Sequence, residues 1–322
     1  MKIAFVGKGG AGKTTLAALF ARHLAAQGAT VWAIDADINQ NLAAALGDDA
    51  DAAALYPTLG EHLDQIKEYL RGDNPRISST AAMVKTTPPG RGSRLLRVVE
   101  DNPIYRRCVR TVDGVRLAST GGFAESDLGV ACYHSKVGAV ELILNHLVDA
   151  DDEYVVVDMT AGADAFASGL FTRFDRTFVI CEPTVRAVGV YRQYRDYAAD
   201  DQVAVSVVGN KVADAADERF LREQVGAELL ASFGVSRHVR AADQGHAGPI
   251  TDLEPANRAV LDSMRSTVDA TPRDWARFTR QAVQFHLRNA AAWANDRTGE
   301  DLAGQIDPDF TLGPAALSAL VR

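Results

Sequence analysis

The chain has few cysteines and no excess of basic residues. Its 322 residues include only three cysteines, Cys108, Cys132 and Cys181, and no Cys-x-x-Cys pair. This usage argues against a disulfide framework and is typical of a reducing compartment. The formal net charge is −8. An acidic chain is a poor candidate for sequence-independent nucleic-acid binding, which needs clustered lysine and arginine opposite phosphates.

Long apolar runs and a targeting segment are also absent from the sequence. No run approaches the roughly 18 apolar residues that a membrane-spanning helix needs. Lys2 is followed at once by a short apolar run and a glycine-rich stretch, which does not fit a signal peptide. We therefore expect a cytoplasmic protein without a membrane partner.

Short apolar runs alternate with helical patterns along most of the chain. Helical spacing of apolar residues predicts helices over 14–27 and 137–148. Strands that are apolar on both faces are typical of a parallel sheet covered by helices. The sequence thus predicts an α/β fold with a mostly parallel, twisted sheet flanked by helices on both faces. The predicted strands are 3–6, 31–34, 115–118, 154–157, 178–181 and 203–208.

Two segments depart from this rhythm. Residues 48–114 read as a helical and loop insertion, in which a capping box at 58–61 precedes a helix and the stretch "TTPPGRGSR" predicts a mobile loop. Residues 268–322 read as a helical extension, with Thr271 followed by proline as a helix start. We expect this extension to pack on the main domain, residues 1–267, although a partner-binding helix is the alternative. Its apolar stripe consists of Trp275, Phe278, Ala282 and Phe285.

The stretch "GKGGAGKT" from Gly7 to Thr14 matches the phosphate-loop pattern, after a strand and before a helix. Glycines let successive backbone N–H groups turn toward one anion, and the following helix adds its dipole. Lys13 should reach the β- and γ-phosphates, and Thr14 should ligate Mg²⁺. The alternative is a glycine-rich turn without a ligand. The residues expected to contact nucleotide here are Gly7, Lys8, Gly9, Gly10, Ala11, Gly12, Lys13, Thr14 and Thr15.

Lys8 gives this loop a second feature. The stretch "GKGGAGKTT" resembles the deviant Walker A loop of the MinD/ParA/Mrp class of P-loop ATPases. In that class the early lysine reaches across a two-fold interface to the nucleotide of the partner subunit. The resemblance implies a homodimer with ATP at its interface, slow and dimerisation-dependent hydrolysis to ADP and phosphate, and catalytic roles for Lys8 and Lys13. A solvated surface lysine is the alternative for Lys8.

Acidic residues follow two of the predicted strands, at the edge where α/β sheets bind ligands. By resemblance to the same class, Asp37 would orient or activate the attacking water and Asp35 would support the loop or the Mg²⁺ shell. Helix capping by Asp37 or Asn39 is the alternative. Asp158 resembles the Walker B aspartate that binds Mg²⁺ through water. Gly162 resembles the switch residue that senses the γ-phosphate.

The stretch "VVGNKVAD" resembles the base-recognition motif of this class. Asn210 would read adenine, because its amide offers both a donor and an acceptor. Guanine-selective proteins carry aspartate three residues after that asparagine, where this chain has Ala213, and Asp214 comes one position too late. We therefore expect ATP rather than GTP. The other residues expected at this pocket are Lys211, Glu182 and Pro183.

Three further stretches, "IDADINQNLAAALG", "VVVDMTAG" and "CEPTVRAV", resemble the CooC group, which matures carbon monoxide dehydrogenase. The resemblance covers about residues 1–47 and 115–265. In that group two subunits pool Cys-x-Cys pairs to hold a metal at the dimer interface. Here the matching residues are Cys132 and His134, and two such pairs could hold Ni²⁺ or Zn²⁺. The alternative is a small buried cysteine beside a surface histidine.

Three functional hypotheses follow from the resemblance. The first is a maturation or metallochaperone ATPase with a protein client. The second is a spatial or partition ATPase of the ParA/MinD type, although the C-terminal residues lack the basic amphipathic helix of membrane positioning. The third is a small-molecule kinase or ligase on the same fold. The arginine-rich segment 91–110 is either a partner-docking surface or a solvated loop.

Overall fold

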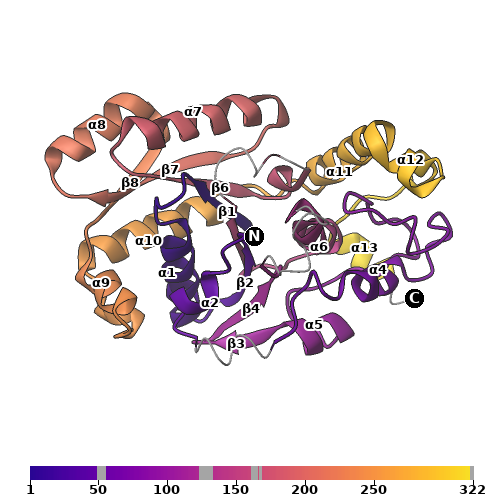
Figure 1. Cartoon of the computed structure of the whole chain (residues 1–322), viewed down its shortest axis with the longest axis horizontal. Coiled ribbons are helices and arrows are strands. Elements are labelled where there is room, and N and C mark those ends of the chain that lie inside the picture. The colour runs from indigo at the N-terminus through magenta and orange to yellow at the C-terminus, as the bar shows by residue number, and fades with distance from the viewer. Residues whose placement is uncertain (49–55, 123–132, 161–165, 167–168, 320–322) are drawn as a thin grey trace.

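The computed structural model describes residues 1–48, 56–122, 133–160, 166 and 169–319 (Figure 1). One eight-stranded sheet runs through the molecule in the order β3-β4-β2-β5-β1-β6-β7-β8. Neighbouring strands are parallel except for β3 and β4, which are antiparallel. The strands are β1 (Lys2–Gly7), β2 (Thr30–Ala36), β3 (Arg110–Val112), β4 (Val115–Ser119), β5 (Glu153–Met159), β6 (Arg176–Cys181), β7 (Val205–Val212) and β8 (Leu229–Gly234).

Helices cover both faces of the sheet and bury alternate residues of each strand. In β1, Ile3 and Phe5 belong to the apolar cluster beneath α1 (Lys13–Ala26) and α10 (Pro255–Asp269). Ala4 and Val6 belong to the cluster on the opposite face. Burial on both faces explains the continuous apolar runs of the sequence. The longer helices of that opposite face are α6 (Tyr133–His146), α7 (Val185–Ala198) and α8 (Ala215–Val225).

The predicted fold class is confirmed, and each predicted strand overlaps an observed one. The structure adds the edge strands β3 and β8, which were not predicted. The remaining helical elements are α2 (Leu42–Ala45), α4 (Leu63–Arg71), α5 (Pro103–Cys108), α9 (Arg237–Asp243), α11 (Trp275–Asn289), α12 (Asn295–Thr298), α13 (Pro314–Ala319), the 3₁₀ turns η3 (Gly169–Thr172), η4 (Ala199–Asp201), η5 (Gly226–Glu228), η6 (Ile250–Asp252) and η8 (Leu302–Gln305), and the π-turn η7 (Ala290–Ala294).

The insertion is packed where the sequence predicted mobility. Residues 86–90 are buried although they have no regular structure. The Thr87 hydroxyl donates to Gln305 Oε1 at 3.1 Å, and the Arg91 guanidinium contacts Asp307 at 2.8 Å. The expectation of a mobile loop was therefore wrong, because this stretch finds its partners in the C-terminal extension.

The C-terminal extension also begins differently from its prediction. Helix α11 starts at Trp275, and the Asp274 carboxylate caps it by accepting from the Arg277 N–H at 2.7 Å. Thr271 is not the cap, since its hydroxyl donates to the Thr267 carbonyl at the end of α10. The predicted helix start was thus three residues too early, because the threonine serves the preceding helix.

The insertion and the extension share two small apolar clusters, and we call residues 78–95 with 275–317 the insertion–tail unit. Ala82 and Val84 pack with Ala290, Ala294 and Leu302. Figure 1 shows α4, α11, α12 and α13 on the same side of the molecule, beside α6. The apolar stripe of α11 is therefore covered within the chain. The second cluster contains Leu95, Val148, Leu312, Trp275, Phe310, Ala316 and Leu317.

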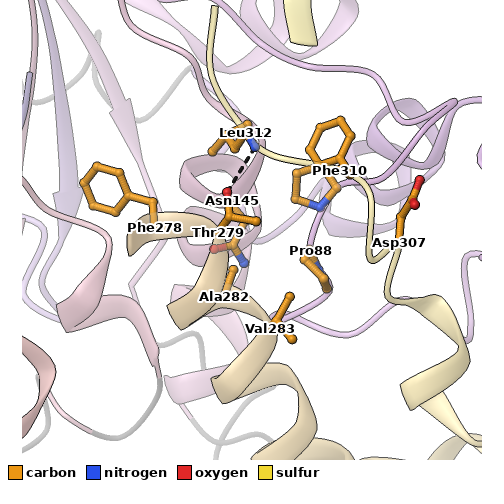
Figure 2. A pocket seen from close by; sticks show the side chains of 10 residues that line it. Pro88, Asn145, Phe278, Thr279, Ala282, Val283, Asp307, Phe310 and Leu312 are labelled. Carbon is orange, nitrogen blue, oxygen red and sulfur yellow. Dashed lines mark hydrogen bonds between the residues drawn. The ribbon is translucent and has the colours of Figure 1, made fainter. Parts of the chain in front are cut away.

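Figure 2 shows a cleft at this junction. Pro88 and Pro89 of the insertion line it together with Phe310 of the extension. The Leu312 N–H donates to the Thr279 hydroxyl at 3.0 Å and joins the last part of the extension to α11 within it. Most of the lining is apolar, so the cleft belongs to the packing between the two segments.

The packing of α11 makes a testable prediction for stability. Phe278 is 2% exposed and lies on this helix, as does the exposed Leu287. Phe278→Ala is expected to lower the free energy of unfolding by about 3–5 kcal/mol, because it leaves a cavity. Leu287→Ala is the matched control and should change it by less than about 0.5 kcal/mol. Urea unfolding measures both values, and equal values would contradict the packing described here.

Candidate functional site

The candidate site lies at the carboxyl ends of the central strands. β2, β5, β1, β6 and β7 are adjacent and parallel, so their carboxyl ends meet at one edge of the sheet. The glycine-rich loop follows β1, and the acidic residues belong to β2, β5 and the turn after β2. The sequence-predicted residues of these strands are therefore brought to one edge, where open α/β sheets bind ligands.

Backbone geometry at the loop requires glycine at two positions. A Cβ at Gly7 would lie 2.4 Å from the Ile180 carbonyl oxygen, and one at Gly12 would lie 2.2 Å from Asn210 Nδ2. Gly12 also has a φ of +90° and begins α1 without a side-chain cap. The first N–H groups of α1 thus remain available to an anion.

Lys13 is enclosed at the base of the loop. Its side chain is 6% exposed, and its Nζ lies 3.9 Å from Asp37 Oδ2. The charge of this ammonium group also acts on Asp158, so Lys13 faces more than one of the acidic residues. The loop therefore presents one cation together with its backbone N–H groups, a combination that suits a phosphate chain.

Thr14 and Asp158 form the candidate Mg²⁺ site. The Thr14 hydroxyl donates to Asp158 Oδ2 at 2.5 Å, and the buried Asp158 Oδ1 has no hydrogen-bond partner among the described residues. Burial, together with the charge of the neighbouring Asp35, raises the pKa of Asp158 to about 8. A hydroxyl and an unsatisfied carboxylate oxygen are ligands that Mg²⁺ accepts. The residues present therefore fit the ion.

Asp35 holds the turn after β2. Its Oδ1 accepts from the Asp37 N–H at 3.1 Å, and its Oδ2 accepts from the Leu42 N–H at 2.8 Å. Burial raises its pKa to about 7, although both hydrogen bonds lower it. Because each oxygen already binds a backbone group, this arrangement favours support of the loop over a place in the Mg²⁺ shell.

Asp37 closes a turn of its own. Its Oδ1 accepts from the backbone N–H and the Nδ2 of Asn39, both at 2.9 Å, and its Oδ2 is the oxygen nearest Lys13. Helix α2 begins after Asn41 with no side-chain cap, so neither Asp37 nor Asn39 caps it. The helix-capping alternative is therefore wrong for α2. Oδ2 remains directed at the lysine that should hold the phosphates.

Lys8 and Thr15 lie at the outer and inner ends of the loop. Lys8 is half-buried, and its Nζ donates to the Gly9 carbonyl at 3.2 Å. Lys8 forms no ion pair with any residue that the structure describes. Thr15 is half-buried in the first turn of α1. The two lysines of the loop thus differ, since only Lys13 faces the acidic residues.

The predicted base-pocket residues brace the loop from β6 and β7. Asn210 Nδ2 donates to the Ala11 carbonyl at 2.7 Å. Lys211 Nζ donates to the Gly10 carbonyl at 2.7 Å and pairs with Glu182 Oε1 at 2.7 Å. Sequence reasoning missed this bracing. Its only local signal is the Asn-Lys pair after an apolar run. Pro183, also predicted at this pocket, is half-buried beside Glu182.

Asp214 has a different task from the aspartate of guanine-selective proteins. Its side chain caps α8 by accepting from the N–H groups of Ala216 and Asp217 at 2.8 and 3.1 Å. Both bonds go to Oδ1, so this carboxylate serves the start of α8.

Some predicted residues fall outside this description. Gly162 and Cys132 lie outside the described residues, and of His134 only the backbone, at the start of α6, is described. Within the described part of the chain, no group of three or more His, Cys, Asp or Glu residues could hold a metal. Cys108 and Cys181 are buried core thiols, and burial raises their pKa values to about 11 and about 12.

The arginine-rich segment is largely paired within the chain. Arg106 contacts Asp101 at 2.6 Å, Arg110 contacts Asp48 at 2.7 Å, and Arg107 donates to Gln65 at 2.9 Å. Carboxylates neutralise Arg106 and Arg110, whereas Arg107 binds an uncharged amide, so these contacts offset only part of the positive charge of the segment. Among the helices of the described ranges, none is long and apolar enough to cross a membrane.

Comparison with known proteins places residues 3–240 in a family model described as the CobQ/CobB/MinD/ParA nucleotide binding domain. The carbon monoxide dehydrogenase accessory protein CooC of Rhodospirillum rubrum is 30% identical over 261 residues, which are 80% of this chain and 92% of CooC. An ATP-binding protein of Methanocaldococcus jannaschii is 27% identical over 234 residues, which are 71% of this chain and 83% of that protein.

Solved structures share the fold at low sequence identity. The septum site-determining protein MinD of Pyrococcus horikoshii, complexed with Mg-ADP, has a TM-score of 0.55 at 14% identity and covers 83% of this chain and 95% of its own. A ParA family ATPase of Chlorobium tepidum has a TM-score of 0.56 at 13% identity, with coverages of 82% and 97%. At these identities the likeness shows the fold alone.

The raised pKa of Asp158 makes a prediction for the ligand-free protein. A carboxyl with a higher pKa in the folded state makes that state bind more protons, so the free energy of unfolding falls as pH rises from about 4 to about 8. Asp158→Asn removes this penalty. In the presence of a chelator, its melting temperature should exceed that of the parent by about 3 °C or more at pH 8, and by less at pH 5.

The exposed Asp296, at the start of α12, gives the matched control. Asp296→Asn should leave the pH dependence of the melting temperature unchanged. A parallel profile for Asp158→Asn and the parent between pH 5 and pH 8 would show that this carboxyl is not destabilised by its site.

Proposed function

We propose that this chain, which belongs to the CobQ/CobB/MinD/ParA family of nucleotide-binding domains, is a slow, dimerisation-dependent ATPase that serves in the maturation of a metalloprotein. The observation that carries the proposal is that the two lysines of the loop have different surroundings. Lys13 faces the buried carboxylates, whereas Lys8 contacts only the carbonyl of its neighbour Gly9 among the described residues.

The chain's own groups supply most of the chemistry that phosphoryl transfer to water needs. Backbone N–H groups of the loop and of α1 would bind the phosphates, with Lys13 balancing their charge. Asp37, held by Asp35 and Asn39, would orient the attacking water through Oδ2. Thr14 and Asp158 would hold Mg²⁺, which when bound offsets charge on the phosphates.

Lys8 would act on the nucleotide of a second copy of the chain. Its Nζ has no carboxylate partner in the described structure, so little has to be broken before it reaches across an interface. A cation arriving from a partner subunit stabilises charge that develops in the transition state. Hydrolysis would then depend on assembly of the dimer.

A maturation role is favoured over spatial positioning by two observations. Similarity to CooC covers most of both chains. In addition, Ala316 and Leu317 of α13 pack in the apolar cluster with Leu95, so this helix serves the insertion–tail unit. We propose a cytoplasmic setting and a protein client. Ni²⁺ or Zn²⁺ would be the cargo, bound by Cys132 and His134 of two subunits.

Lys8→Ala tests the role of the second lysine. Affinity for Mg·ATP should stay within about threefold, while kcat falls by about 100-fold or more, because a transition-state cation is lost. ATP-dependent dimerisation should disappear as well. Lys67→Ala, which removes a lysine of α4 in the insertion, is the matched control. Turnover kinetics and light scattering measure both effects. A Lys8→Ala monomer with full turnover would refute hydrolysis in trans.

Cys132→Ser tests the metal cargo. We expect about one Ni²⁺ or Zn²⁺ per dimer in the parent protein and none in the variant, since a thiolate ligand is removed. Cys108→Ala, at a core thiol, is the control and should keep its metal. Elemental analysis of the purified dimer gives the stoichiometry.

Metal-independent turnover stimulated by DNA or vesicles would favour a partition or positioning ATPase. Phosphate transfer to a small molecule would favour a kinase or ligase.

A further inference from the structure

A short backbone segment lies between the Asp37 turn and the start of the insertion. The Thr120 N–H donates to the Asp35 carbonyl at 2.9 Å, which joins the segment to the end of β2. On its other side, the Leu59 N–H donates to the Ser119 carbonyl at 2.8 Å, and the Gly60 N–H donates to the Thr120 carbonyl at 3.0 Å. Residues 119–121 are thus bonded at once to the nucleotide-side turn and to the insertion.

Gln40 connects the turn to this segment through its side chain. Its Nε2 donates to the carbonyl of Asp37 and to the Thr120 hydroxyl, the latter at 3.1 Å. Its Oε1 accepts from the Gly121 N–H at 3.2 Å. One amide therefore binds the backbone of the residue expected to position water and two consecutive residues of the neighbouring segment.

The backbone of Gln40 is held in an uncommon conformation. Its φ is +51°, in the left-handed region that few residues other than glycine adopt. Such a conformation persists where surrounding contacts impose it. Three side-chain bonds hold this conformation, together with a backbone bond from the Gln40 N–H to the Asp37 carbonyl at 3.4 Å.

The segment also contacts the insertion with no space between them. A Cβ at Gly121, whose φ is +97°, would lie 2.7 Å from the Thr58 hydroxyl. Thr58 in turn exchanges hydrogen bonds with Glu61 at 2.7 and 3.4 Å, just before α4. Close packing transmits a displacement of the segment to the insertion, because no gap can absorb it.

We propose that Gln40 is a positioning residue that couples the Asp37 turn to the insertion. Its side chain fixes the backbone of Asp37 against Thr120 and Gly121, and these residues fix Leu59 and Gly60. Nucleotide that orders the Asp37 turn therefore orders the insertion at Leu59 and Gly60 as well. This coupling rests on the proposed function in one respect, namely that nucleotide binds at the glycine-rich loop.

The coupling can be measured in the full-length chain by hydrogen exchange. The quantity compared is the exchange rate of the Leu59 and Gly60 amides with and without Mg·AMPPNP. In the parent protein the analogue should slow exchange there by about tenfold, because bound nucleotide stabilises the folded turn against local opening. In Gln40→Gly the slowing should shrink to less than about twofold, with kcat about tenfold lower and KM within about threefold.

Two further variants separate side-chain reach from backbone effects. Gln40→Asn keeps an amide and tolerates a positive φ, but it is one methylene shorter, so it should behave like Gln40→Gly. Gln65→Ala removes an exposed glutamine of α4 that binds Arg107 outside this path, and it should behave like the parent.

The outcomes distinguish this proposal from the function on which it rests. Calorimetry first establishes whether the parent binds Mg·AMPPNP, and absence of binding overturns both proposals. If the parent binds but its Leu59 and Gly60 amides exchange at an unchanged rate, the coupling alone is refuted. The coupling is also refuted if Mg·AMPPNP still slows amide exchange in Gln40→Gly. It is refuted as well if Gln65→Ala abolishes the slowing to the same extent as Gln40→Gly.

Discussion

The site depends on the close approach of the glycine backbone in the loop to residues of β6 and β7. Gly7 leaves no room for a side chain against the carbonyl oxygen of Ile180 in β6, and Gly12 leaves none against the amide of Asn210 in β7. This contact lets Asn210 and Lys211 hold the carbonyls of Ala11 and Gly10. With those carbonyls turned toward the protein, the N–H groups of the loop and of α1 are left to face a ligand.

Buried charge is the second feature of the site, and the sheet brings it to the same edge. Three carboxylates meet one enclosed ammonium group there, and burial raises the pKa values of Asp35 and Asp158. Charges in such surroundings cost folding free energy unless they are paired. Strongly shifted groups in one location mark functional sites more often than structural ones. Here a phosphate chain with its cation would provide the missing partners. The insertion–tail unit lies to one side of this edge, and Gln40 reaches from the site toward the insertion.

The sequence predicted those parts of the molecule whose signals are local. The strand, the glycine loop and the helix at residues 2–26 follow each other directly, so pattern alone identified them. The choice between the two roles of Asp35 needed the structure, because its partner Leu42 lies seven residues away. The packing of the insertion could not be predicted from the sequence. Thr87 and Gln305 are 218 residues apart, and the residues around each of them show no helical or strand periodicity. The pairing of Lys211 with Glu182 likewise joins the ends of two strands that α7 separates along the chain.

Isothermal titration of Mg·ATP into the intact, folded chain addresses the loop most directly. Saturable heat is expected with a dissociation constant below about 1 mM, which corresponds to about −4 kcal/mol. The heat should be lost in Lys13→Ala, because the enclosed cation of the loop is removed while its glycines remain. A parent protein that gives no heat, or a Lys13→Ala variant that binds as tightly as the parent, would contradict the assignment of this loop to a nucleoside triphosphate.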